Sequence, residues 1–314
     1  MTATRDSEQP FHSPSTDKFQ KSTNSAADEG AGVVLALGGG FSRGFAHLGV
    51  LKVLEQERIP VATIVGTSIG GLLGAAYADG IPLQVLSDLG RQVRVRDFLR
   101  FHQSGHAEDE ALWQIPAQRK DCIGQFVQDW FRTCRLEDLP IPTAIVATNL
   151  ATGAPYVFVR GPIETAIRAT CAFPGLVKPV VYDGHQLADG CMAAPVPSEI
   201  AARIGGGRVL AVSVGSSSAS AGSAENVVRV FDRDFGSSQR SALEPSWARH
   251  ADILLEPQVH RIAWNDFSRV DEAFDSGAEA MRRALPFLRE LLARPSRFSP
   301  ATGESLRAER DLAL

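Results

Sequence analysis

The sequence lacks the features that mark several large classes of protein. Its net charge is only −4 over 314 residues, so no strong positive field is present to attract nucleic acid or an anionic membrane. Its four cysteines show no CxxC spacing, which argues against a zinc ribbon or a redox motif. Cys122 and Cys134 could pair, but a chain of this size does not need a disulfide framework. We therefore expect a reducing compartment, no metal and no nucleic-acid partner.

Long hydrophobic runs are also missing. No uncharged apolar run reaches the roughly 18 residues that a membrane-spanning helix needs. Residues 1–30 are rich in Ser, Thr, Asp and Gln and lack the apolar stretch of a signal peptide, so they are interpreted as a disordered leader. Residues 294–314 are interpreted as a polar tail. The expected location is cytoplasmic, and any contact with a membrane is expected to be peripheral.

What the sequence does contain is an alternation of strand and helix patterns. The run VVLAL (33–37) stops at three glycines and is followed by a helical pattern from Gly44, and ATIVG (62–66) precedes an Ala/Leu-rich helical stretch that ends at Gly80. Strand, loop, helix, strand, turn and helix in this order predict a parallel sheet. Further apolar runs follow at 143–150, 154–159, 208–215 and 252–257, with a helix expected across 267–293. One α/β domain over residues 31–293 is the economical prediction.

Residues 91–140 do not continue the strand pattern. They are charged and aromatic and show amphipathic helical character near 119–133, so we interpret them as a helical insertion. Their aromatic side chains make the insertion a candidate cap over a site, although ordinary helix packing is the better explanation of any single one of them: Phe98, Phe101, Trp113, Trp130 and Phe131.

A glycine loop follows the first expected strand, in LGGGFSRGFAHLGVLK (37–52). Consecutive glycines at a helix N-terminus let backbone N–H groups converge on an anion, which could be a pyrophosphate or the oxyanion of an acyl-transfer intermediate. The strict G-x-G-x-x-G spacing ending at Gly44 fails because Phe41 takes the place of the second glycine. Nucleotide binding is therefore the weaker interpretation, and a turn required only for packing is the plain alternative.

The stretch GTSIG (66–70) places Ser68 between an expected strand and an expected helix. A G-x-S-x-G in that context is typical of a nucleophile elbow, in which a tight turn raises the serine hydroxyl above the sheet. Adjacent parallel strands would place Gly38–Gly40 beside Ser68, at the carboxyl ends where ligands bind. The sequence therefore predicts a nucleophile paired with an oxyanion hole.

A serine nucleophile needs a base, and the residues alone leave two candidates open. Asp189, in QLADGCMAAPVP, follows a short apolar run and could lie at a strand end, although Asp-Gly is also an ordinary turn. His250 and His260 follow the later strands and could complete a Ser–Asp–His order. His47 is expected to pack along the first helix.

These stretches together resemble the patatin-like phospholipases, in particular the bacterial members related to the catalytic domain of neuropathy target esterase. The resemblance is carried by LGGGFSRGFAHLGVLKVLE, GTSIGG, AIRATCAFPGLVKPV and LADGCMAAPVP in that order, and it covers about residues 32–290. It implies a three-layer α/β/α fold with a mostly parallel central sheet. It also implies a lipid acyl hydrolase (a phospholipase, lysophospholipase or carboxylesterase) that acts on a lipid ester without a cofactor.

Carried over by position, the resemblance makes Ser68 the nucleophile and Asp189 the base of a dyad without histidine. It assigns the oxyanion hole to Gly38, Gly39, Gly40 and Phe41, with supporting roles for Arg43, Gly44, Gly66, Gly70 and Gly190. Two positions depart from the family pattern: Phe41 replaces a common glycine, and Cys191 replaces the usual third residue of Asp-Gly-Gly or Asp-Gly-Ala. Two alternatives remain, a regulatory or scaffold protein that keeps the fold, and an α/β-hydrolase with a histidine triad.

Overall fold

A computed structural model of the protein describes residues 32–93, 122–175, 177–215 and 246–293. The expected leader and tail, and residues 94–121 of the expected insertion, lie outside the described residues. The described helices and strands are β1 (Val33–Leu37), α1 (Ala46–Gln56), β2 (Val61–Thr67), α2 (Ile69–Ala78), α3 (Leu83–Gln92), α5 (Cys122–Trp130), β3 (Thr143–Asn149), β4 (Pro155–Phe158), α6 (Ile163–Thr170), β5 (Val180–Tyr182), β6 (His185–Asp189), α7 (Ser198–Ile204), β7 (Arg208–Val212), β8 (Ile253–Leu255) and α9 (Val270–Ala293). Short 3₁₀ turns are η2 (Phe41–Phe45), η4 (Leu136–Asp138), η5 (Gly190–Met192), η6 (Ser246–His250) and η7 (Phe267–Arg269).

The strands form a central sheet that is mostly parallel, as expected. Strands β3, β2, β1, β7 and β8 lie side by side and run in parallel. Strands β4 and β6 pair with β3 in the antiparallel sense, and β5 pairs antiparallel with β6. Because β1 has neighbours on both edges and helices over both faces, all five of its side chains are buried, which explains the unbroken apolar run VVLAL.

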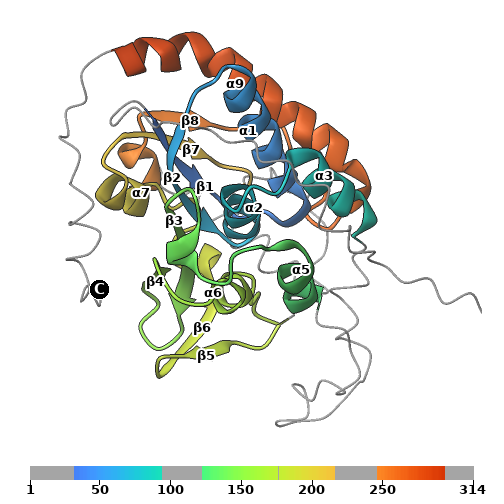
Figure 1. Cartoon of the computed structure of the whole chain (residues 1–314), viewed down its shortest axis with the longest axis vertical. Coiled ribbons are helices and arrows are strands. Elements are labelled where there is room, and N and C mark those ends of the chain that lie inside the picture. Colours follow the sequence, from blue (N-terminus) through green and yellow to red (C-terminus); the bar gives the residue numbers. More distant parts are fainter. Residues whose placement is uncertain (1–31, 94–121, 176, 216–245, 294–314) are drawn as a thin grey trace, which may run out of the picture.

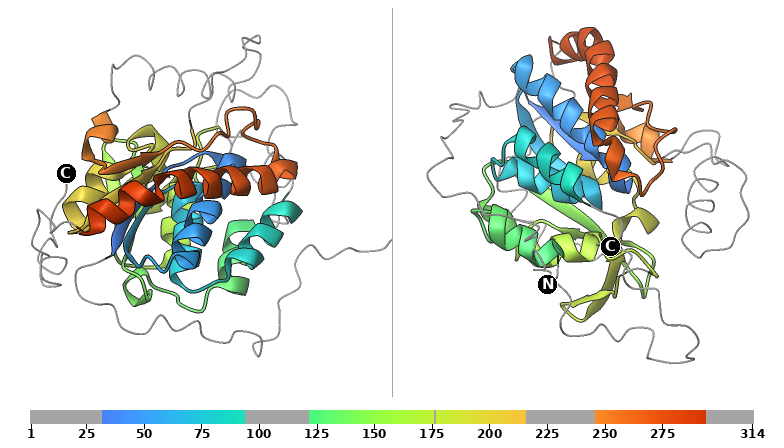
Figure 2. Two further views of the ribbon diagram at one scale, coloured as in Figure 1. Left: turned by 90° about the horizontal axis from the view of Figure 1, so that it is seen from above. Right: turned by 90° about the vertical axis from the view of Figure 1, so that its right-hand side faces the viewer.

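Helices cover the two faces of the sheet unequally, which makes the fold a three-layer α/β/α sandwich. On one face, alternate β1 residues such as Leu35 and Leu37 join the large core under α1, α2 and α9. On the other face, Val34 and Ala36 pack in a smaller core against Ala201 of α7. Figures 1 and 2 show α1, α2, α3 and α9 together on one side and α7 on the other, with α9 lying along α1.

Two strands that run in opposite directions meet on one edge of β3. Strand β4 occupies the other edge, where it pairs with residues 145–148. On the shared edge, β2 ends with Thr67 opposite Val146, and β6 ends with Asp189 opposite Ala147. Since β2 is parallel to β3 and β6 is antiparallel to it, their carboxyl ends face each other. This pairing brings the turn after β2 next to the end of β6.

The described part of the insertion is helical. Helix α5 lies within the stretch near 119–133 that the amphipathic pattern indicated, and it packs against α6. Among the described residues, no helix is both long enough and apolar enough to cross a bilayer.

Candidate active site

Ser68 occupies the sharp turn between β2 and α2. Its φ of +53° lies in the left-handed region, which costs a non-glycine residue about 1–3 kcal/mol. The neighbouring glycines permit the turn: a Cβ on Gly66 would lie 2.5 Å from the carbonyl oxygen of Gly70, and one on Gly70 would lie 2.3 Å from that of Leu37. The strand, tight turn and helix that the G-x-S-x-G stretch predicted are therefore all present.

The hydroxyl of Ser68 donates a hydrogen bond to Asp189. The distance from Ser68 Oγ to Asp189 Oδ2 is 2.7 Å, and the backbone N–H of Cys191 donates to Oδ1 at 2.9 Å. Both side chains are buried, with exposed fractions of 6% for Ser68 and 1% for Asp189. The hydroxyl of Thr148 holds the backbone carbonyl of Asp189 at 2.8 Å. Two residues far apart in the sequence therefore form a bonded, desolvated pair.

Burial controls the proton affinity of the Asp189 carboxyl. Loss of solvent raises its pKa from 3.8 to about 6, and the hydrogen bonds from Cys191 N–H and from the Ser68 hydroxyl offset part of that rise. The carboxyl group is therefore ionised at neutral pH, yet it binds a proton more readily than an exposed aspartate. This is the balance that a general base near neutral pH requires.

The glycine loop lies beside Ser68, and only part of it can present free amides. A Cβ placed on Gly39 would lie 3.2 Å from Ser68 Cβ. The amide of Gly38 donates to Val212 O and that of Gly39 donates to Pro195 O, each at 3.0 Å. Among the described residues, the amides of Gly40 and Phe41 have no hydrogen-bond acceptor. Of the four residues predicted for an oxyanion hole, Gly38 and Gly39 use their amides within the fold, and Gly40 and Phe41 remain candidates.

Phe41 also adopts a left-handed conformation, with φ +49°. Its ring makes edge contacts with Phe173 (ring centroids 5.2 Å apart) and with Trp264 (4.9 Å). Aromatic contacts of this kind contribute about 0.5–1.5 kcal/mol each, which is comparable to the cost of the backbone conformation. The three rings therefore explain how phenylalanine is held where glycine would be less strained.

Residues after Phe41 attach the loop to the C-terminal part of the chain. The amide and the hydroxyl of Ser42 donate to Trp264 O at 3.1 and 2.8 Å. Arg43 is buried, and its Nε donates to Ile262 O at 2.7 Å. This bond joins Arg43, just after the glycine loop, to the segment that precedes α9. The other supporting glycines lie at close approaches: Gly44 against the side chain of Ile69 and Gly190 against the carbonyl of Val146.

The histidines that the structure describes take no part in the Ser68–Asp189 pair. His47 is fully buried, its Nε2 lies 2.7 Å from Gly38 O, and burial lowers its pKa to about 4, so the ring is neutral and Nε2–H donates to the loop. No histidine within the described ranges hydrogen-bonds to Ser68 or Asp189, and this includes His250 and His260. The histidine-triad alternative therefore has no base in this arrangement.

Two neighbours of the pair, Thr170 and Cys171, were not singled out from the sequence. Thr170, at the end of α6, accepts a hydrogen bond from Ser68 N at 2.7 Å and donates to Val146 O, so its hydroxyl joins the serine turn to β3. The thiols of Cys171 and Cys191 lie close to the pair, where burial and the charge of Asp189 raise their pKa and keep them neutral. No spacing or motif signals Thr170, because its role depends on how α6 packs.

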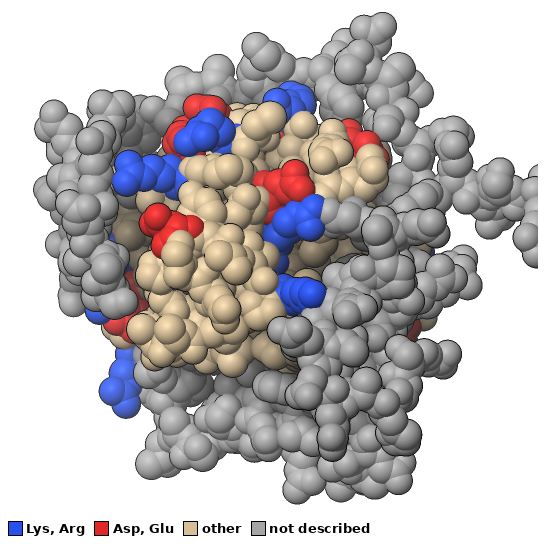
Figure 3. Space-filling view, turned by 90° about the horizontal axis from the view of Figure 1, so that it is seen from below, with Lys and Arg blue, Asp and Glu red and all other residues tan. Residues whose placement is uncertain are grey.

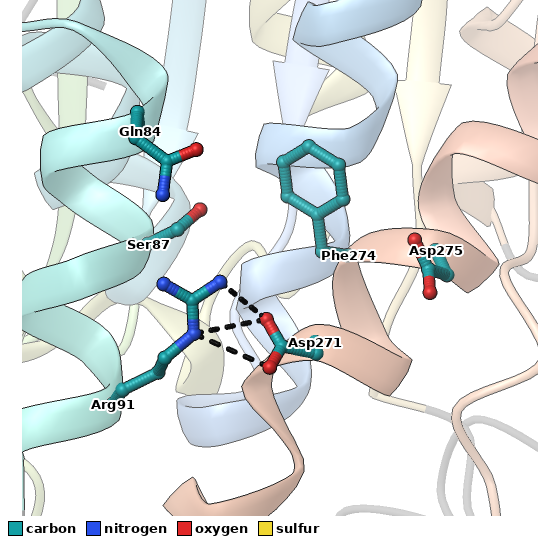
Figure 4. A pocket seen from close by; sticks show the side chains of 6 residues that line it. All are labelled: Gln84, Ser87, Arg91, Asp271, Phe274 and Asp275. Carbon is teal, nitrogen blue, oxygen red and sulfur yellow. Dashed lines mark hydrogen bonds and ion pairs between the residues drawn. The ribbon is translucent and has the colours of Figure 1, made fainter.

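A hollow lies between α3 and α9, away from Ser68. Figure 4 shows its lining residues, with the guanidinium of Arg91 bound to Asp271: Gln84, Ser87, Arg91, Asp271, Phe274 and Asp275. Arg91 also pairs with Asp88, so carboxylates already neutralise its charge. This hollow offers no activated nucleophile. Within the described ranges, no three His, Cys, Asp or Glu side chains group as a metal site.

Comparison with known proteins identifies the family. The model of the patatin-like phospholipase family matches residues 35–202, which include the glycine loop, Ser68 and Asp189. The chain belongs to the patatin-like phospholipase family. The expected family and the expected fold class are both confirmed.

Relatives within this family are similar over about three fifths of the chain. An uncharacterized NTE family protein of Mycobacterium tuberculosis is 35% identical over 187 residues, which are 60% of this chain and 50% of the relative. Patatin-like phospholipase domain-containing protein 6 of Homo sapiens is 31% identical over 59% of this chain and 13% of its own length. Lysophospholipase NTE1 of Mycosarcoma maydis is 31% identical over 60% of this chain and 10% of its own length. The matched region thus spans about half of the mycobacterial relative and a small part of the other two.

Proposed function

We propose that this protein is a serine lipid acyl hydrolase that cleaves a fatty acyl ester of a phospholipid or lysophospholipid. The observation that carries the proposal is the 2.7 Å hydrogen bond from the Ser68 hydroxyl to the buried Asp189 carboxylate. Membership in a family of phospholipases, and the similarity to a protein named lysophospholipase, support the choice of a lipid ester as substrate.

In the proposed reaction, Asp189 accepts the proton of the Ser68 hydroxyl as Ser68 Oγ attacks the ester carbonyl carbon. The amides of Gly40 and Phe41 stabilise the oxyanion that forms, and such a donor typically contributes about 3 kcal/mol. The intermediate collapses, the alcohol leaves with the proton from Asp189, and an acyl-enzyme remains. Water then attacks the acyl-enzyme while Asp189 takes its proton, and the fatty acid is released as Ser68 regains the proton.

The surface near β5 and β6 supports contact with lipid from the aqueous side. Seen from below, the described surface has a continuous area without Lys, Arg, Asp or Glu, and charged side chains lie above it and beside it (Figure 3). Val181 on β5 is 73% exposed and Leu150, after β3, is 38% exposed. Both lie next to Gln186 of β6. Two neighbouring exposed apolar side chains favour contact with an apolar partner.

A regulatory or scaffold role is the competing function, and the buried pair speaks against it. Burying the Asp189 carboxylate is unfavourable, because its hydrogen bonds offset only part of the cost of removing it from water. A protein that acts through its surface alone would not need such a group. The buried Ser68–Asp189 pair beside the free amides of Gly40 and Phe41 therefore supports a catalytic role over a purely structural one.

The test combines labelling with turnover. A fluorophosphonate should modify the protein, and peptide mapping should place the label on Ser68. The purified protein should release fatty acid from lysophosphatidylcholine, and Ser68→Ala should lower that rate by at least about 10⁴-fold without loss of the fold. Ser87→Ala is the matched control, because Ser87 is a buried serine whose hydroxyl has no hydrogen-bond partner. Equal rates for Ser68→Ala and the wild type would refute the proposal.

A further inference from the structure

Three aromatic side chains from distant segments meet next to the candidate active site. Phe41 belongs to the glycine loop, Phe173 to the connection between α6 and β5, and Trp264 to the connection between β8 and α9. The ring of Phe41 contacts the other two, at interplanar angles of 72° and 68°. We call these three residues the aromatic wall.

Each segment of the aromatic wall is fixed close to the reacting pair. Gly39, two residues before Phe41, lies against Ser68. The carbonyl of Ala172, which precedes Phe173, accepts the backbone N–H of Asp189 at 2.9 Å. Trp264 is held by the bonds from Ser42 to its carbonyl. The contact between Phe41 and Phe173 therefore connects the two loops that flank Ser68.

The rings of the aromatic wall are only half-buried, in contrast to aromatic pairs that serve the core. Phe45 and Phe267 form a similar edge contact, but both are buried in the large core. Phe41, Phe173 and Trp264 each keep part of their surface in solvent. Core packing therefore explains the first pair, whereas the three rings of the aromatic wall do not belong to the large core.

We propose that Phe41, Phe173 and Trp264 bind the acyl chain of the substrate beside the scissile carbonyl and so favour long-chain esters over short ones. The proposal rests on the proposed function, because it assumes that Ser68 attacks an acyl ester. The physical basis is apolar burial: the partly exposed rings lie on the loops beside Ser68 and Asp189, and a linear hydrocarbon chain is stabilised by covering their apolar surface.

The experiment compares long and short acyl chains in the same samples. We would measure kcat/KM for p-nitrophenyl dodecanoate and p-nitrophenyl acetate, together with the rate of Ser68 labelling by a long-chain and a short-chain alkyl fluorophosphonate. Trp264→Leu and Phe173→Leu should each lower the ratio of long-chain to short-chain kcat/KM by about tenfold. Phe287→Leu is the control, because Phe287 is an aromatic residue on α9 that is 53% exposed and outside the wall. Its ratio should equal that of the wild type.

A third variant, Phe41→Gly, is included because it is expected to fold even if the other two do not. Glycine accepts the positive φ of this position, so the variant removes the ring without adding strain. It should lower the ratio in the same direction. If Ser68 is still labelled and the ratio of long-chain to short-chain kcat/KM is unchanged in all three variants, the proposed role of the aromatic wall is wrong and the proposed function stands. The three variants are Phe41→Gly, Trp264→Leu and Phe173→Leu. A wild-type protein that neither probe labels and that hydrolyses neither ester would overturn the proposed function as well.

Discussion

The parallel and antiparallel parts of the sheet contribute different halves of the candidate site. The parallel strands β1 and β2 end in the glycine loop and in Ser68. The antiparallel strand β6 ends in Asp189. The first part is assembled from residues close together in the sequence, whereas the hydrogen bond to the second spans 121 residues. The serine turn is therefore a local structure, and the pairing of serine with aspartate is a property of the whole sheet.

This difference predicts that the position of Asp189 is more sensitive to distant changes than the turn at Ser68. The turn at Ser68 is enforced by close contacts of Gly66 and Gly70 with neighbouring backbone. The position of Asp189 depends on the register of β6 along β3, in which Asp189 lies opposite Ala147. A slip of one residue would turn the carboxylate to the other face of the sheet. Three changes on the antiparallel side, or where the two parts join, would test this comparison.

The largest expected effect is that of Asp189→Asn. Removing the base should lower kcat for ester hydrolysis by about 10³-fold. The folded protein raises the pKa of Asp189 to about 6 from 3.8, so it binds this proton more tightly than the unfolded chain does. Ionisation therefore lowers stability as pH rises from about 4 to 6, and the neutral asparagine should raise the free energy of unfolding at pH 7 by about 1 kcal/mol. Turnover and chemical denaturation at pH 7 measure the two effects.

Asp79→Asn supplies the matched control for that variant. Asp79 is also a buried carboxylate, but it lies at the C-terminal end of α2 and accepts a hydrogen bond from Arg132 N at 2.7 Å. Its replacement should lower stability and leave the turnover number within about twofold. If both variants lost activity equally, Asp189 would have no special part in the reaction.

A smaller effect is expected from pH. The Asp189 carboxylate must be ionised to accept the serine proton, and burial places its pKa at about 6. The value of kcat/KM should therefore fall about tenfold per pH unit below that pH and level off above it. Circular dichroism over the same range would verify that the fold persists. A midpoint near pH 7 that disappears in His250→Gln or His260→Gln would instead point to a histidine base.

The smallest expected effect is that of Thr170→Val, which acts at the junction of the two parts. Valine removes the acceptor for Ser68 N–H and the donor to Val146 O. Leaving buried backbone groups unpaired should lower the free energy of unfolding by about 1–3 kcal/mol. A displaced serine should lower kcat by about tenfold with a smaller change in KM. Thr143→Val is the control, since the Thr143 hydroxyl donates to the carbonyl of Ile141, two residues away. An equal loss of activity in this variant would show that Thr170 has no special role.

The sequence predicted the parallel part of the fold well because its signals are local. Buried strands such as VVLAL, the glycine loop and the G-x-S-x-G turn each depend on residues within a few positions of one another. The antiparallel pairing of β4 and β6 with β3 was not predicted, since short apolar runs do not specify a partner or a direction. Thr170 and Trp264 were missed for the same reason. Their positions follow from packing between distant segments, and no motif surrounds them.

The attachment of the glycine loop to later parts of the chain has a consequence for biosynthesis. The family match at residues 35–202 already contains Ser68 and Asp189, yet Val212, Ile262 and Trp264, which hold the loop, are translated afterwards. A ribosome therefore exposes the hydroxyl and the carboxylate before the segments that orient the loop amides have emerged. If the proposed function holds, nascent chains should be poor hydrolases until residues 208–215 and 246–264 have docked.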